Sequence, residues 1–279
     1  MRLASLPWYD LREVQGAHDA LWSAIAGRLR AAGLPRVPSA LERETHYAAQ
    51  WNSGRLLLGQ ACGYDVAMGQ SQTLQIVATP RFDIRGCSGP YYRSFVVVRR
   101  RDPARTLADL RGRRCVINTE TSHSGMNALR QLVAPLQQDG RFFGSVFVSG
   151  AHERSVVAVV TGEADVAAID CISYGLLARH RPQALVELRI LCETDQAPAP
   201  PFVTSASTPQ WQVEAIRAVL DEVLDDAEQP SPWSALRLRG VSVLAPDAYE
   251  PIVTAARAAI ETDYHELSFD AVEPPRCLG

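Results

Sequence analysis

The chain has 279 residues, and its 28 basic and 31 acidic residues give a formal net charge of −3 at pH 7. Hydrophobic residues make up 47% and charged residues 21%, which is typical of globular proteins and excludes disordered and fibrous classes. The near-neutral charge argues against nucleic-acid binding, which needs a strongly basic surface. No apolar run approaches the roughly 18 residues of a membrane span, so we expect neither a nucleic-acid partner nor a membrane span.

The first ten residues contain one arginine and no apolar stretch of the kind that a signal peptide has. This pattern favours the cytosol, or a leader that has been removed. The six cysteines are widely spaced and form neither a CxxC pair nor a Cys/His cluster. We therefore expect no metal site and mostly reduced, buried thiols.

The first part of the chain predicts a helix over residues 17–32, because Ala17, Leu21, Ile25 and Leu29 recur at every fourth position. The other elements predicted there are a strand over 2–8, a helix over 45–53, a short buried segment over 56–59, and strands over 74–79 and 94–98.

The middle of the chain alternates between strands and helices. Strands are predicted over 115–118, 145–149, 166–169 and 186–191, and helices over 107–112, 126–136, 155–160 and 172–179. Such alternation predicts a parallel sheet with helical crossovers.

A proline-rich segment at 196–201 is followed by predicted helices over 210–225 and 251–262. We therefore predict two α/β lobes. The first comprises residues 1–92 and 194–279, and the second, residues 93–193, is inserted into it. Two strand-like crossings, near 92–98 and 191–199, would join the lobes.

A polar segment, residues 119–125, lies between a predicted strand and a predicted helix. Free backbone N–H groups at a helix start attract anions. Ser122 and Ser124 would add hydroxyl donors, and Gly125 would let a ligand approach the backbone. An ordinary N-cap serine followed by glycine would look the same.

Three further positions are candidates for ligand contacts. His152 follows a predicted strand and would point from a loop into the crevice at the strand ends, where open α/β sheets bind ligands, unless it is a solvent-exposed or capping residue. Asp170 ends an apolar strand and is either a helix N-cap or a ligand group. The paired residues Tyr91 and Tyr92 would close over a ligand or pack between lobes.

We find no nucleophile, nucleotide or metalloprotease motif, and the neighbours Ser122 and His123 do not make a catalytic dyad. Every basic residue is arginine, which excludes lysine Schiff-base chemistry. We therefore expect no catalytic residues, no metal and no cofactor.

Several segments, in this order, resemble the phosphate/phosphite/phosphonate substrate-binding proteins of ABC transporters. They are LLLGQACGY (56–64), GCSGPYYRS (86–94), SHSG (122–125), SGAHERS (149–155) and GEADVAAID (162–170). The resemblance covers about residues 1–205. His123 stands where the family usually has threonine or glutamine, and the family is usually exported, whereas no leader is visible here.

The resemblance implies a type II periplasmic-binding-protein fold, with two α/β lobes and a hinge that closes on a small oxyanion. In that family the serine loop and a histidine hold the phosphonate oxygens, and an acidic residue completes the site. Carried over, the ligand-binding residues of the second lobe are Ser122, His123, Ser124, Gly125, His152 and Asp170. Those of the first lobe, which form the opposite wall, are Gln60, Tyr64, Trp8, Tyr9, Tyr91 and Tyr92.

We therefore expect a non-enzymatic solute-binding protein that captures a phosphonate, phosphite or phosphate in an inter-lobe cleft for an ABC-transporter permease. The resemblance places it in the periplasm, whereas the missing leader keeps the cytoplasm open. The alternatives are an intracellular ligand sensor and an enzyme on the same fold. Asp170 would accept a hydrogen bond from a P–OH group or a ligand ammonium and would repel a fully deprotonated anion.

Overall fold

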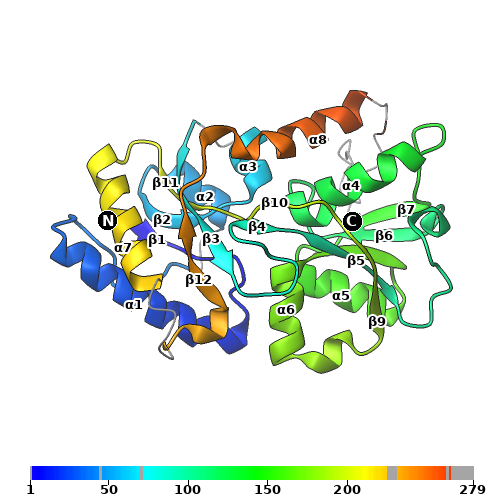
Figure 1. Ribbon diagram of the computed structural model, residues 1–279, viewed down its shortest axis with the longest axis horizontal. Coiled ribbons are helices and arrows are strands. Elements are labelled where there is room, and N and C mark those ends of the chain that lie inside the picture. Colours follow the sequence, from blue (N-terminus) through cyan, green and yellow to red (C-terminus); the bar gives the residue numbers. More distant parts are fainter. Residues whose placement is uncertain (1, 44–45, 69–71, 225–230, 262–263, 265–279) are drawn as a thin grey trace, which may run out of the picture. The chain divides into compact units, whose positions relative to one another are not determined.

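The computed structural model describes residues 2–43, 46–68, 72–224, 231–261 and 264 (Figure 1). The chain folds into two compact units. Unit 1 comprises Met1–Arg93, Cys171–Pro182 and Asp195–Val253, and unit 2 comprises Ser94–Asp170, Gln183–Thr194 and Thr254–Gly279. The lobe boundaries expected from the sequence stay a prediction, and each unit is described by its own bounds. No helix in the described ranges is long and apolar enough to cross a membrane.

Unit 1 contains a five-stranded sheet in the order β1-β2-β11-β3-β12. The strands are β1 (Leu3–Ala4), β2 (Leu56–Gln60), β3 (Leu74–Phe82), β11 (Phe202–Ser205) and β12 (Leu238–Ser242). β1 runs parallel to β2, and the remaining pairs are antiparallel. A separate two-stranded ribbon joins β4 (Tyr91–Tyr92) to β10 (Ala197–Pro198).

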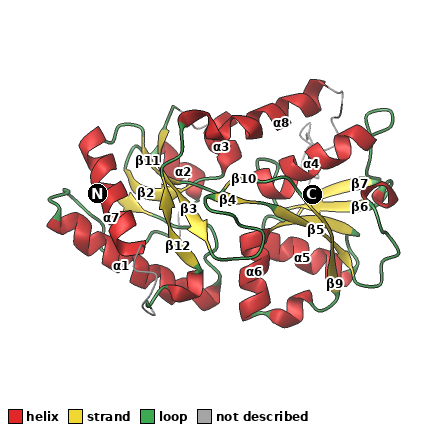
Figure 2. Cartoon of the chain, in the orientation of Figure 1, coloured by secondary structure: helices red, strands yellow, loops and turns green. Residues whose placement is uncertain are grey.

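The helices of unit 1 are η1 (Arg12–Val14), α1 (Gln15–Ala31), α2 (Tyr47–Asn52), α3 (Gly63–Met68), α6 (Cys171–His180), α7 (Gln210–Leu224), η6 (Ser234–Leu236) and η7 (Pro246–Tyr249). The predicted helix over 17–32 is confirmed as α1, which buries its apolar face and lies beside α7 (Figures 1 and 2). Part of three predicted helices, at residues 45, 225 and 262, lies outside the described residues.

Unit 2 contains a second five-stranded sheet in the order β7-β6-β8-β5-β9. The strands are β5 (Ser94–Arg99), β6 (Arg114–Ile117), β7 (Ser145–Val148), β8 (Val166–Asp170) and β9 (Leu188–Glu193). Helical segments between them are η2 (Leu107–Leu110), η3 (His123–Asn127), α4 (Ala128–Val133), η4 (Ala134–Leu136) and α5 (His152–Thr161). η5 (Pro182–Leu185) and α8 (Glu250–Glu261) each span a boundary between the units.

The predicted parallel arrangement is confirmed for β6, β7, β8 and β9, which all run in one direction. β5 lies between β8 and β9 and runs the opposite way. The chain first enters unit 2 at Ser94, and its second segment in unit 2 ends at Thr194, whose backbone N–H donates to the Ser94 carbonyl at 2.9 Å. Because these two residues are adjacent, the first and last strands of the unit run in opposite directions.

The first strand is shorter than predicted, since β1 ends at Ala4 rather than residue 8. Pro7 has no backbone N–H to donate to a sheet, and Tyr9 adopts a positive φ of 65°, so the chain turns away there.

Asp165, in the segment GEADVAAID, is structural. Its carboxylate pairs with Arg99 at 2.6 Å and with Arg114 at 2.9 Å, and it also accepts from the Arg114 backbone N–H. The Arg114 hydrogen bond is the largest of the effects that hold the pKa of this carboxyl well below its usual range. The ion pairs join β5, β6 and the start of β8, which stabilises the sheet on which the candidate site is built.

Candidate functional site

The serine loop, residues 122–125, leads into a helical turn of unusual hydrogen bonding. The Asn127 N–H donates to the Ser122 carbonyl at 3.0 Å, five residues back, and the Gly125 N–H donates to the Ser122 hydroxyl at 3.0 Å. The helix predicted to begin at residue 126 therefore begins at His123, as the π-helical turn η3. Single π turns are common at functional sites.

Position 125 requires glycine because its backbone lies very close to the Asn118 side chain. A Cβ atom added to Gly125 would lie 1.9 Å from Asn118 Oδ1 and 3.1 Å from His152 Cε1. A side chain at this position would therefore displace both neighbours. From the sequence, Asn118 is expected only as the last residue of a strand, because nothing in its spacing distinguishes it from other residues that end strands.

His152 contacts the serine loop through its Nε2 atom. This atom lies 3.0 Å from Ser124 Oγ and 3.4 Å from Asn118 Nδ2. An amide nitrogen can only donate, so both contacts are satisfied when Nε2 accepts and the ring proton is on Nδ1. Burial lowers the pKa of His152 to about 4, and a hydrogen bond to the Ala168 backbone opposes that shift. The ring is therefore neutral at pH 7.

The expectation that His152 lies in a loop is wrong. The residue is the first of α5, because Ala151 is extended and its carbonyl accepts the Ser155 N–H at 3.0 Å. A rigid helix start therefore holds the imidazole next to Ser124.

His123 is held by a different set of side chains. The Arg130 guanidinium donates to Asn127 Oδ1 at 3.0 Å, which leaves the Asn127 amide nitrogen to donate to His123 Nδ1 at 3.2 Å. The neutral His123 ring then carries its proton on Nε2. Burial lowers the pKa of this buried histidine to about 4. Asn127 and Arg130 are not predicted to support the site, because in the sequence they are ordinary positions of the predicted helix.

Asp170 is placed at the same edge of the sheet as the serine loop. It ends β8, which runs parallel to β6, and the parallel strands β6, β7 and β8 lead respectively to Asn118, His152 and Asp170. The Asp170 side chain is buried, with 2% of its surface exposed. Crevices outside the carboxyl ends of parallel strands are the usual ligand sites of open α/β sheets.

The residues expected to form the opposite wall all belong to unit 1. Trp8 stacks on Trp51, with ring centroids 6.0 Å apart, and Tyr9 meets the edge of Phe82 at 5.4 Å. Tyr64 is half-buried on α3. The two tyrosines of β4 differ, because Tyr91 is exposed and Tyr92 is buried at 2%. Tyr92 is therefore a packing residue in this unit.

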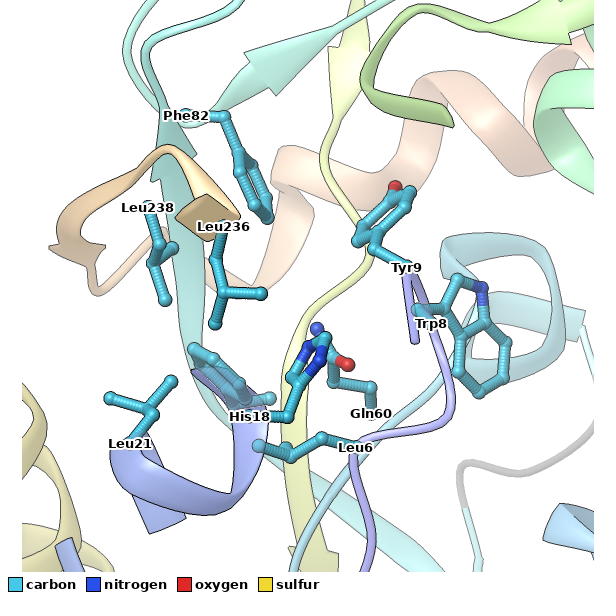
Figure 3. Close-up of a pocket in the computed structure, with 10 residues that line it drawn as sticks. Leu6, Trp8, Tyr9, His18, Leu21, Gln60, Phe82, Leu236 and Leu238 are labelled. Atoms are coloured by element: carbon cyan, nitrogen blue, oxygen red, sulfur yellow. The ribbon is translucent and has the colours of Figure 1, made fainter. Parts of the chain in front are cut away.

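Gln60 lies in a small cavity within unit 1, of about 20 Å³, which is room for about one water molecule (Figure 3). Figure 3 shows the Gln60 amide beside the His18 imidazole, among apolar side chains. His18 Nδ1 lies 3.0 Å from the Asp10 carboxylate. The buried Gln60 Oε1 has no hydrogen-bond partner among the described residues. The described residues contain no cluster of metal-ligating side chains.

We predict that Gly125→Ala lowers the free energy of unfolding by about 2 kcal/mol, because its Cβ overlaps Asn118 Oδ1. The matched control is Gly27→Ala in α1, where a Cβ meets nothing within 4 Å. There the gain in helix propensity is expected to stabilise by about 0.5–1 kcal/mol. Urea unfolding measures both. Equal stability of Gly125→Ala and wild type would contradict the close approach.

The buried His123 predicts a pH dependence of stability. In the unfolded chain, His123 takes up a proton below its ordinary pKa of 6.5, whereas in the folded chain it does so only near pH 4. The unfolded state therefore binds more protons between these two pH values, and the free energy of unfolding falls as the pH is lowered from 6.5 to 4. The loss from this residue is up to about 3 kcal/mol. We expect His123→Gln to flatten the curve of unfolding free energy between pH 6.5 and 4. A curve of wild-type slope would show that His123 is not buried in its neutral form.

Comparisons with known proteins identify the family of the chain. No curated protein matches the sequence significantly. Residues 3–249 match the family described as "ABC transporter, phosphonate, periplasmic substrate-binding protein".

Several solved structures are similar in fold. PhnD1 from Prochlorococcus marinus, in complex with methylphosphonate, has 15% identity over 93% of this chain and 98% of that chain, with a TM-score of 0.76. A binding-protein component of an ABC phosphonate transporter from Pseudomonas aeruginosa has 15% identity over 94% and 87%, with a TM-score of 0.73. The alkanesulfonate-binding protein SsuA from Xanthomonas axonopodis pv. citri, bound to MOPS, has 16% identity over 95% and 93%, with a TM-score of 0.62.

At these identities the structural matches show the fold alone, which is that of the type II periplasmic binding proteins. The family match spans most of the chain. The chain therefore belongs to the phosphonate-binding family of periplasmic substrate-binding proteins of ABC transporters, whose members bind substrates for transport and are not enzymes.

Proposed function

We propose that this protein binds a phosphonate, phosphite or phosphate in the periplasm and delivers it to the permease of an ABC transporter. In this proposal Ser122, His123, Ser124, Gly125 and His152 of unit 2 hold the phosphorus oxyanion. The observation that carries it is the cluster in which Ser124 Oγ and Asn118 Nδ2 both meet His152 Nε2 at the ends of parallel strands.

The loop offers a neutral, hydrogen-bonding environment. The Ser124 hydroxyl and the Asn118 amide can turn their donors to an incoming oxyanion, and such charge-assisted hydrogen bonds are strong. His152 Nε2 then needs a new donor, because it is an acceptor in the free protein. A P–OH group supplies that donor, whereas a sulfonate at neutral pH has none. The site therefore favours singly protonated phosphorus oxyanions.

Asp170 adds to this preference in the proposal. Its buried carboxylate would accept a hydrogen bond from P–OH or from the ammonium of an aminoalkylphosphonate, and would repel an anion without protons. From unit 1, Gln60, Tyr64, Trp8, Tyr9 and Tyr91 are proposed to contact the substituent on phosphorus, and the buried Tyr92 is proposed to support that wall by packing.

We expect isothermal titration at pH 7 to detect binding of at least one among methylphosphonate, 2-aminoethylphosphonate, phosphite and phosphate, and weaker binding of methanesulfonate and sulfate. Ser124→Ala and His152→Ala should each weaken the phosphorus ligand about tenfold or more, since each removes a charge-assisted hydrogen bond. The matched control is Ser207→Ala, in an exposed turn of unit 1, which should leave Kd unchanged. Wild-type affinity in both site variants would overturn the assignment.

Asp170→Asn tests selectivity separately. The uncharged amide no longer repels a fully deprotonated anion, so the ratio of phosphate to sulfate affinity should fall about tenfold. Asp221→Asn, at an exposed position of α7, is the control for the loss of one negative charge. An unchanged ratio in Asp170→Asn would exclude Asp170 as a selectivity residue while leaving the serine loop untested by that result.

A further inference from the structure

We propose that Cys87 and Cys171 form a disulfide bond in the mature protein. Their Sγ atoms lie 3.6 Å apart, although the residues are separated by 84 positions in the sequence. Cys87 is half-buried and Cys171 is buried. This proposal differs from the expectation of mostly reduced thiols, which rested on the wide spacing of the cysteines in the sequence.

The two segments are held together by contacts that do not involve sulfur. The Cys87 N–H donates to the Ile84 carbonyl at 3.0 Å, which forms the turn that carries Cys87. Ile84 in turn packs on α6, where a Cβ on Gly175 would lie 2.5 Å from Ile84 Cγ2. The absence of a side chain at Gly175 thus permits this close packing. At the start of α6, the Cys171 N–H donates to the Arg93 carbonyl at 3.0 Å.

The two sulfurs are close enough to be in contact. They must approach by about 1.5 Å to reach the length of an S–S bond. Cys115 is fully buried in β6, and Cys192 is half-buried in β9.

The surroundings of the protein supply the oxidant. The family is described as periplasmic, and the bacterial periplasm keeps protein thiols oxidised. The Cys87 thiolate, which is the more accessible of the two, attacks an external protein or glutathione disulfide and releases one thiolate. The Cys171 thiolate then attacks the Cys87 sulfur and displaces the second. Two protein thiols are oxidised, one external disulfide is reduced to two thiols, and the protons pass to solvent and to the released thiolates.

The disulfide would include the residue that directly follows Asp170 in the chain. Cys171 is the first residue of α6 and directly succeeds Asp170 at the end of β8. The crosslink would therefore fix the start of α6 against the turn at 84–87. It would also close a long loop, which restricts the unfolded chain more than a short loop does.

The first test is chemical. The purified full-length protein is equilibrated in a series of glutathione buffers from reduced to oxidised, alkylated after denaturation and digested. At the oxidised end we expect a crosslinked peptide pair containing Cys87 and Cys171, and alkylation of Cys87 reduced about tenfold or more. Alkylation of Cys192, the matched half-buried thiol, should change by less than about twofold. Separate alkylation of Cys87 and Cys171 at the oxidised end would overturn the proposal.

The second test is thermal. Oxidised wild type should melt roughly 5–10 °C above reduced wild type. Cys87→Ala, at a half-buried position, should show no redox-dependent change in Tm, whereas Cys192→Ala should keep the wild-type difference. Equal Tm values for oxidised and reduced wild type would contradict a stabilising crosslink. Neither test includes a phosphorus ligand, so both outcomes are independent of the proposed function.

Discussion

The close approach between Gly125 and Asn118 is the constraint on which the candidate site depends. It places the Asn118 amide within 3.4 Å of His152 and lets the backbone after Ser124 pass directly over the end of β6. Ser122 secures the same turn by accepting the Gly125 N–H. The hydrogen-bonding groups are therefore arranged before any ligand arrives, which reduces the ordering cost of binding.

The sheet of unit 2 brings the polar groups of the candidate site to one edge. Three parallel strands end at one edge, and each delivers a polar residue there, while the ion pairs of Asp165 hold two of those strands together at their other end. Burial keeps both His123 and His152 neutral. A neutral histidine can accept a hydrogen bond from a protonated ligand, which in the proposed function would separate phosphorus oxyanions from sulfonates without an excess of positive charge.

Much of this could be predicted from the sequence, because strand ends followed by Ser, His and Gly are visible in one dimension. The serine loop, His152 and Asp170 were named as candidates in that way, and the structure places them at one edge of the unit 2 sheet. Asn118 and Arg130 were missed because their roles arise from tertiary contacts and not from spacing. The π turn at His123 has no propensity signal. The reversed direction of β5 between β8 and β9 is a matter of strand pairing, which periodicity does not report. The pairing of Cys87 with Cys171 likewise appears only once α6 is packed.

The central claim is that a phosphorus oxyanion binds beside Ser124 and His152. The most direct measurement is a titration of the uniformly ¹⁵N-labelled protein with methylphosphonate, followed through the imidazole nitrogens, with each histidine signal assigned by substitution. The account predicts that His152 Nε2 shifts from an accepting nitrogen toward a protonated or strongly hydrogen-bonded one, while His180, the last residue of α6, does not change. A shift of His180 with His152 unchanged would place the ligand elsewhere and contradict the account.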